Sequence, residues 1–315
     1  MTNFKTCLVT GGCGFIGSAL VRKLVEKEII VHVVDNLSSG DKNRLADVDC
    51  NLIVSNFDNQ KILQMIKEKK FDTIFHLAAI PSVSFSIENP SLTTEINIAS
   101  TVRLFEAAIG NVKRIVFSSS AAVYGDKYEH DISSIFGKHP ITPYAWQKSA
   151  IEDISKIFCN LYDIDIVSLR YFNVYGPGQT GNTPYSSVIS AWINCIENND
   201  PLILEGDGSQ SRDFVYIDDV VRANIITANH NEQFNGIAYN VSTGVPTTNN
   251  KVLEHFCDYY EEVKVKNAPS RKGDIKLSLG NSSRIKSHLN FYTKTSFSEG
   301  ITKTFNWHNN KKETK

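Results

Sequence analysis

Short β-rich runs alternate with helical stretches over the first 120 or so residues, and this alternation is the feature that most limits the possible folds. The β-rich runs are KTCLVT, IIVHVVD, NLIVSN and DTIFHLA, separated by helical stretches such as GSALVRKLVEK and QKILQMIKEKK. A further helical stretch, SLTTEINIASTVRLFEAAIG, leads into VKRIVFSSS. This pattern is typical of βαβ units, which build a parallel sheet with helices on both faces. We therefore predict an α/β fold with a doubly wound parallel sheet.

The first β-rich run continues into TGGCGFIGSAL, which places Gly11, Gly14 and Gly17 directly before a helix. Glycines at this spacing permit a tight turn, close approach of the backbone to a pyrophosphate and close packing of helix on strand. The second run ends at Asp35, eighteen residues after Gly17, where a carboxylate can bind both hydroxyls of an adenosine ribose. Because that carboxylate would repel a 2′-phosphate, the sequence predicts a Rossmann-like fold that binds NAD rather than NADP.

Tyr144 and Lys148 are four residues apart on a predicted helix, so both side chains can point toward one ligand. A free tyrosine is only about one part in a thousand phenolate at neutral pH. A lysine ammonium about 4 Å away would supply an interaction on the order of 4 kcal/mol, enough to make the tyrosine a working base. The pair therefore predicts proton transfer to or from a bound substrate.

Three serines, Ser118, Ser119 and Ser120, end the run VKRIVFSSS at the carboxyl end of a predicted parallel strand. Ligands bind at such ends in doubly wound sheets. A serine there could share a proton with Tyr144 or hold a substrate hydroxyl. Ser118 and Ser119 could equally be small residues that allow a helix to pack.

These motifs together resemble the extended short-chain dehydrogenases/reductases, and within them the nucleotide-sugar 4-epimerases of the UDP-glucose/UDP-N-acetylglucosamine 4-epimerase type. The resemblance also rests on HLAA, RYFNVYGPGQ, GDGSQSRDFVYIDD, YNVSTG and RKGD, and it covers nearly the whole chain. It implies that NAD is contacted by Gly11, Gly14, Phe15, Ile16, Gly17, Asp35, Asn36, Ser38, Gly40, Asn56, Phe57, Leu77, Ala78, Ala79, Asn97, Ser118, Tyr144, Lys148 and Tyr171.

The same resemblance implies how the substrate is held. Tyr144 would be the base, Ser120 its partner on the 4-hydroxyl of the sugar, and Lys148 the residue that binds the nicotinamide ribose and lowers the pKa of Tyr144. The other substrate contacts that it implies are Asn173, Arg212, Arg271, Asp274 and Ser278. Arginine suits a diphosphate because its guanidinium can donate two parallel hydrogen bonds.

Two positions depart from the family pattern. Ser55-Asn56 stands where the family often has Gly-Asp, so an amide replaces a carboxylate beside the adenine, which we expect to weaken rather than abolish binding. Gln147 precedes the lysine, where Ser or Thr is usual. This second departure leaves Tyr144 and Lys148 in register.

The residue after the three serines, Ala121, indicates which reaction the site can catalyse. Sugar-nucleotide 4,6-dehydratases and uronate decarboxylases resemble TDExYG and TSExYG, whereas here Ala121 stands at the glutamate position. Without that second proton-transfer group, we expect reversible C4 epimerisation through a transient 4-keto sugar. Ser278 stands where family members restricted to the plain hexose have tyrosine, and a small residue leaves space for an acetamido group. We therefore expect UDP-N-acetylglucosamine and UDP-N-acetylgalactosamine as the substrate pair, with UDP-glucose and UDP-galactose as a second pair that the enzyme could accept.

Two alternatives remain open at this point. One is a UDP-glucuronate-type or other nucleotide-sugar epimerase or oxidoreductase of the same family. The other, less favoured, is a non-enzymatic NAD-sensing module, which would be expected to lack the Tyr144–Lys148 pair and the diphosphate arginines.

The rest of the chain suggests location and partners. The formal net charge of -1 gives no reason to expect nucleic-acid binding, and no apolar run is long enough to span a membrane. The N-terminus enters a strand directly, and the six scattered cysteines lack the spacing of a metal site, so we expect a cytoplasmic protein with no metal. The resemblance implies a homodimer built from the helices around residues 92–109 and 144–160.

We predict two parts within the chain. Residues 1–170 plus about 214–240 would form the NAD-binding Rossmann domain, and about 171–213 plus 241–315 a smaller α/β lobe that binds the nucleotide sugar. The boundary is indicated by loops rich in Gly, Asn and Pro that begin after IDIVSLRYFN.

Overall fold

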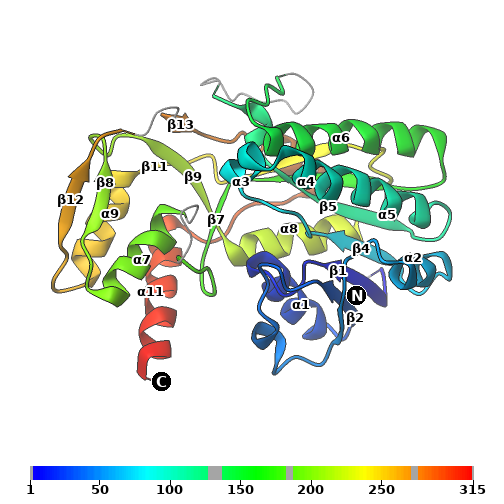
Figure 1. The fold of residues 1–315 in the computed structure, drawn as a ribbon, viewed down its shortest axis with the longest axis horizontal. Helices are drawn as coiled ribbons and strands as arrows, with labels where there is room; N and C mark the ends of the chain where they lie inside the picture. Colours follow the sequence, from blue (N-terminus) through cyan, green and yellow to red (C-terminus); the bar gives the residue numbers. More distant parts are fainter. Residues whose placement is uncertain (1–2, 127–136, 182–186, 271–275, 314–315) are drawn as a thin grey trace.

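The computed structural model of the chain, which describes residues 3–126, 137–181, 187–270 and 276–313, is built around a seven-stranded parallel sheet (Figure 1). The strands, in spatial order, are β3 (Asn51–Val54), β2 (Ile30–Asp35), β1 (Thr6–Thr10), β4 (Thr73–His76), β5 (Arg114–Ser120), β6 (Ile166–Tyr171) and β10 (Ala238–Val241). Each neighbouring pair is parallel. The order reverses between β1 and β4, and ligands bind beyond the carboxyl ends of the strands at such a point. The predicted doubly wound fold is confirmed.

Helices cover both faces of this sheet. They are α1 (Phe15–Val25) and α8 (Ile217–Asn229) on one face, and α2 (Gln60–Lys67), α5 (Ser100–Ala108) and α6 (Pro143–Leu161) on the other. Successive strand residues enter opposite cores: Val9 packs with α1 and α8, whereas Leu8 packs with α2, α5 and α6. This alternation, on strands that are mostly apolar, is what the sequence of a parallel sheet buried on both faces requires.

Shorter elements connect these layers. They are η1 (Lys42–Leu45), α3 (Val83–Glu88), α4 (Pro90–Thr94), the π-helical η2 (Glu95–Ala99) and η3 (Ala121–Tyr124). The stretch SLTTEINIASTVRLFEAAIG is helical as predicted, but the turn at Glu95–Ala99 is a π-helix between α4 and α5. Single π-helical turns are frequent at functional sites.

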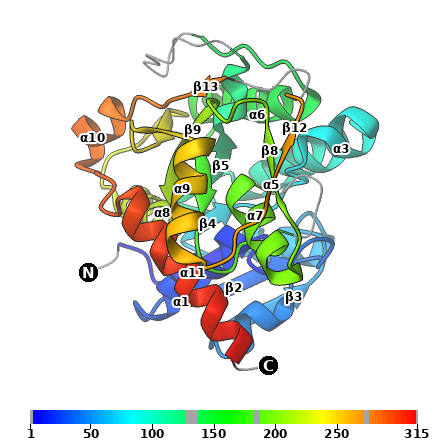
Figure 2. The same cartoon turned by 90° about the vertical axis from the view of Figure 1, so that its left-hand side faces the viewer.

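A smaller lobe lies beside the sheet, on the left of Figure 1 and facing the viewer in Figure 2. Its elements are β7 (Asn173–Tyr175), α7 (Val188–Asn198), β8 (Leu202–Glu205), β9 (Ser211–Tyr216), β11 (Pro246–Thr248), α9 (Asn249–Tyr259), β12 (Val265–Ala268), β13 (Leu277–Ser278) and α11 (Phe297–Glu313). Strands β7, β11 and β13 gather around β9, while β12 pairs with β8. The helix α10 (Ser283–Leu289) packs near β10. Where one part ends and the other begins stays a prediction.

Among the described residues, no helix is both long enough and apolar enough to cross a membrane.

Candidate active site

In the turn between β1 and α1, the backbone of the helix start packs directly against the backbone of the strand end. A Cβ atom added at Gly17 would lie 2.2 Å from the carbonyl oxygen of Gly11, so only glycine allows α1 to begin so close to the strand. Gly11 itself has φ +71°, and a Cβ there would lie 2.8 Å from the backbone nitrogen of Ala78. No acidic side chain stands in the first turn of α1, which begins at Phe15. The helix N-terminus is therefore suited to an anionic group such as a pyrophosphate.

Asp35 ends β2 beside this turn. Its buried carboxylate accepts hydrogen bonds from the backbone N–H groups of Cys13 (2.9 Å) and Leu37 (2.8 Å). Gly40 lies so close that a Cβ atom there would be 2.9 Å from both carboxylate oxygens. The carboxylate is thus fixed at the edge of the glycine turn, where an adenosine ribose would meet it. These residues fit NAD, because a close-packed glycine cradle and an adjacent acid are the two features that its adenosine half requires.

The predicted adenine contacts also come together. The side-chain amide of Asn36 donates to that of Asn56 at 2.9 Å, and the backbone N–H of Ser38 donates to Asn36 Oδ1 at 3.0 Å. Phe57 is buried and packs edge-on against the ring of His76. The amide at position 56, which departs from the family pattern, is therefore already paired with a neighbour in the same predicted site.

Asn97, on the π-helical turn, holds the loop after β4. Its side chain accepts from the N–H of Ile80 at 2.8 Å and donates to the Ile80 carbonyl at 3.1 Å. It also donates to Gln147 Oε1 at 2.8 Å. The loop that contains Leu77, Ala78 and Ala79 is therefore tied through Asn97 to helix α6.

Gln147 gives a physical reason for the departure from the usual Ser or Thr. This fully buried amide accepts from Asn97 and donates from Nε2 to the hydroxyls of Thr93 (2.9 Å) and Thr94 (3.1 Å). A serine or threonine hydroxyl is too short to reach all three partners. The longer amide satisfies them and joins α6 to α4.

The three serines at the end of β5 have different partners. The carbonyl of Ser118 accepts from Lys148 Nζ at 2.6 Å, and the hydroxyl of Ser119 donates to Glu152 Oε1 at 2.5 Å. The hydroxyl of Ser120 accepts from the N–H of Ala122 at 3.2 Å and lies near Tyr144, whose pKa it lowers. Of the three hydroxyls, that of Ser120 is therefore the one placed with the predicted base.

Tyr144 and Lys148 are both buried on α6, with the lysine Nζ 5.9 Å from the tyrosine ring centroid. Burial raises the pKa of Tyr144 to about 12, although the nearby hydroxyl of Ser120 lowers it. Burial lowers the pKa of Lys148 to about 7, and the charge of Glu152 opposes this shift. Burial of the phenol outweighs the effect of Ser120, so the pKa of Tyr144 lies above its ordinary value and not below it as expected from the sequence.

Glu152, which the sequence analysis did not single out, lies one turn beyond Lys148 on the same helix face. It forms a buried two-pronged ion pair with Arg170, at 2.8 Å and 2.6 Å. Arg170 also donates to the hydroxyl of Tyr124 at 2.5 Å, which in turn donates to Asn240 at 2.6 Å. The sequence did carry a signal for Glu152: it stands four residues after Lys148, so the two side chains lie on the same face of a helix.

The predicted substrate contacts lie at the start of the lobe. Arg212 and Ser278 are paired positions on the parallel strands β9 and β13, so their side chains share one face. Asn173 opens β7 opposite Phe214, and the hydroxyl of Tyr171 donates to Asn224 at 2.9 Å. Arg271 and Asp274 lie outside the described residues.

A large cavity, about 1310 Å³, opens between α1, α7, α8 and α11. Phe15 and Gly178 line it, but Tyr144 and Lys148 do not. We therefore place the candidate chemistry at the ends of β5 and α6 rather than in this cavity.

The amino-acid sequence matches the NAD dependent epimerase/dehydratase family over residues 7–242. A UDP-glucose 4-epimerase from Mycolicibacterium smegmatis is 32% identical, with 97% of this chain and 99% of that protein covered. A solved UDP-N-acetylglucosamine 4-epimerase from Methanobrevibacter ruminantium, in complex with UDP-N-acetylmuramic acid, has a TM-score of 0.92 and 36% identity, covering 99% of this chain and 100% of the other. The UDP-glucose 4-epimerase of Thermus thermophilus, in complex with NAD, has a TM-score of 0.87 and 30% identity, covering 96% and 99%. The likeness therefore extends over both the sheet and the lobe.

The lowered pKa of Lys148 predicts a specific pH dependence of stability. The folded chain binds fewer protons than the unfolded chain between about pH 7 and the ordinary lysine pKa of 10.5, so its stability rises with pH across this window. Relative to a Lys148→Met variant, the wild type should gain about 2–4 kcal/mol of unfolding free energy from pH 7 to pH 10. Urea unfolding of the NAD-free proteins measures this, with Lys156→Met on the exposed side of α6 as control. Parallel stability curves for the wild type and Lys148→Met would contradict the assignment.

Proposed function

Because the chain belongs to the NAD dependent epimerase/dehydratase family, we propose that it reversibly epimerises a UDP-hexose at C4, with UDP-N-acetylglucosamine and UDP-N-acetylgalactosamine as the favoured pair. UDP-glucose and UDP-galactose are a second pair that it would accept. The observation that carries this proposal is the buried group formed by Tyr144, Ser120 and Lys148 at the carboxyl end of β5. The position after Ser120 is Ala121, which has no proton to transfer.

The residues divide the proton chemistry between them. Tyr144 would take the proton of the 4-hydroxyl as a 4-keto sugar forms, and would return it when the hydroxyl is restored on the opposite face. Ser120, whose hydroxyl lies near Tyr144, would orient the sugar oxygen between the two hydroxyls. NAD, when bound, supplies the acceptor and donor of the C4 hydride and a positive charge beside the site.

Lys148 has two tasks in this proposal. Its Nζ is held by the carbonyl of Ser118 and lies 4.6 Å above the ring of Phe117, so the side chain is positioned before a ligand arrives. An ammonium there favours the phenolate of Tyr144, while the pKa of about 7 leaves the group close to its titration point at neutral pH. The remaining donors of Lys148 would bind the nicotinamide ribose.

Two observations support a UDP-N-acetylhexosamine as the substrate. Ser278 pairs with Arg212 in the register of β13 and β9, so a small side chain lies next to the residue that we predict to bind the diphosphate. The similar enzyme from Methanobrevibacter ruminantium is a UDP-N-acetylglucosamine 4-epimerase. A UDP-glucuronate-type epimerase remains the second candidate, and Arg271 and Asp274 stay predicted contacts to the diphosphate and uridine ribose.

The proposal is tested by following the anomeric proton NMR signals of UDP-N-acetylglucosamine, UDP-glucose and UDP-glucuronate separately with purified protein and no added NAD. We expect the galacto epimer to appear from the acetylated sugar. Tyr144→Phe should retain bound NAD, because it removes only the hydroxyl, and should be slower by about 10²–10⁴. Conversion of the uronate alone would refute the substrate proposal, and wild-type rates from Tyr144→Phe would refute the mechanism.

The role of Ser278 predicts a change of substrate range. Ser278→Tyr should lower kcat/KM for the acetylated sugar by at least about 100-fold through steric exclusion, while kcat/KM for UDP-glucose changes little. Ser278→Ala, which keeps the space and removes the hydroxyl, is the matched control and should retain both activities. Equal losses on both substrates would indicate a damaged lobe rather than a lost acetamido pocket.

We also propose that the protein is a homodimer. Large apolar side chains are exposed on the adjacent helices α3, α4 and α6, namely Val83, Ile87, Leu92, Trp146, Ile157 and Leu161. Such a patch favours association with a second copy. Leu161→Glu, at a side chain that is 67% exposed, should shift the protein from dimer to monomer by light scattering. Val245→Glu, at a side chain that is 61% exposed on the lobe, should not cause this shift, and a wild-type monomer would contradict the proposal.

A further inference from the structure

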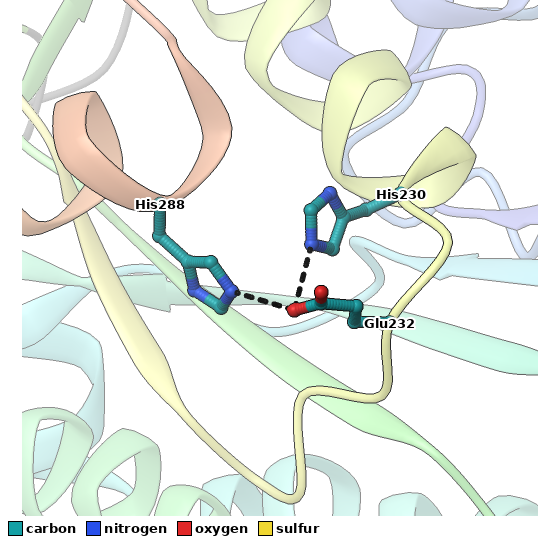
Figure 3. A group of neighbouring side chains, drawn as sticks. All are labelled: His230, Glu232 and His288. Carbon is teal, nitrogen blue, oxygen red and sulfur yellow. Dashed lines mark ion pairs between the residues drawn. The ribbon is translucent and has the colours of Figure 1, made fainter.

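Three side chains gather near the amino-terminal ends of the strands, whereas the candidate active site lies at their carboxyl ends. His230 follows the end of α8, Glu232 lies two residues later, and His288 comes from α10 (Figure 3). Their potential ligand atoms all lie within 4.8 Å of one another. Glu232 Oε2 is 3.9 Å from His230 Nε2 and 3.6 Å from His288 Nε2. Both imidazoles thus point at one carboxylate oxygen.

The backbone of this loop is fixed from below. Arg114, the buried first residue of β5, donates to the carbonyl oxygens of His230 (2.5 Å) and Glu232 (2.7 Å). Its guanidinium is paired at 2.7 Å with buried Asp165, which also accepts from the N–H of Phe234 at 2.8 Å. The loop geometry therefore rests on a buried ion pair and does not depend on the exposed side chains above it.

The imidazole rings are oriented as well. Nδ1 of His288 is hydrogen-bonded to the hydroxyl of Tyr239, which leaves Nε2 to face the carboxylate. Both rings pack against Phe234, with centroids 5.2 Å and 5.9 Å away. A hydrogen bond to the far nitrogen and an apolar shelf are the usual supports of a metal-ligating histidine.

The interactions among the described residues do not account for this arrangement. Both His–Glu separations exceed hydrogen-bond length, and Nε2 of His230 is buried with no hydrogen-bond partner in the part of the chain that the structure describes. A buried ring nitrogen without a partner is costly unless something else binds it. Glu232 is 77% exposed, so its carboxylate can move by the fraction of an ångström that a common ligand requires.

We propose that His230, Glu232 and His288 bind a divalent first-row transition metal ion of the Zn²⁺ type. Two imidazoles and a carboxylate are a donor set suited to zinc, with water completing a tetrahedron. Bonds of about 2.0–2.1 Å place tetrahedral ligand atoms about 3.4 Å apart, close to the two His–Glu separations. Binding requires neutral imidazoles.

The ion would act as a structural link. It would join the loop after α8, which rests on the sheet, to α10, which follows the lobe strand β13. Tyr144 and Lys148 lie at the other end of the strands, so the proposed site is separate from the catalytic groups and stands whether or not the proposed substrate is right.

Calorimetry of the full-length, NAD-bound protein with Zn²⁺, after removal of metals with a chelator, tests the proposal. We expect one ion per chain and a rise in Tm on binding. Glu232→Gln should weaken Zn²⁺ binding at least about tenfold, as should His288→Gln, because each removes a ligand. Glu261→Gln and His255→Gln, outside the cluster, should bind as the wild type does.

The cysteines offer the alternative ligands, since Cys257 is exposed. With Co²⁺ as probe, a histidine and carboxylate site gives visible bands without thiolate charge transfer, and its affinity falls as pH drops below about 6. Thiolate charge transfer, unchanged affinity in Glu232→Gln and His288→Gln, or no bound ion would each overturn the proposal.

Discussion

The carboxylate of Glu152 is the point at which the central sheet and helix α6 are joined. It accepts two hydrogen bonds from Arg170 on β6 and one from Ser119 on β5, while projecting from α6 one turn beyond Lys148. A buried ion pair contributes little net stability against an apolar replacement, but loss of one partner leaves an uncompensated charge, at a cost of about 3–5 kcal/mol. The pair therefore fixes where α6 lies along the strands more than it adds to stability. The positions of Tyr144 and Lys148 therefore depend on this ion pair, because both residues lie on the same helix.

A second buried polar group fixes the other side of the same helix. Gln147 faces α4 and the π-helical turn while Lys148 faces β5, so successive residues of α6 are anchored to different layers. The amide also carries the loop after β4 through Asn97. Because every hydrogen bond in this chain of contacts is buried or partly buried, the predicted NAD site and the predicted base are held by one continuous network.

Much of this arrangement could be predicted from the sequence. The alternation of β-rich runs with helical stretches, the glycine spacing and the Tyr144–Lys148 interval predicted the doubly wound sheet and the family, both of which are confirmed, because each depends on local geometry. The role of Gln147, the π-helical turn and the partners of Glu152 could not be predicted, because they depend on side chains more than 15 residues away. The same is true of His230 and His288, which are far apart in sequence and lack the short spacing that identifies most metal motifs. The pKa of Tyr144 lies above rather than below its ordinary value, because burial cannot be read from a four-residue interval.

The chain leaves the large sheet after β6, builds strands of the lobe, and then returns to the sheet as β10. Strand β10 pairs with β6, with Ala238 opposite Ser168, after the chain has built β7, β8 and β9 of the lobe. Contacts between such distant segments lose much chain entropy and form slowly. The last strand of the large sheet therefore comes from a part of the chain that lies beyond three lobe strands, so no single cut in the sequence would separate the sheet from the lobe.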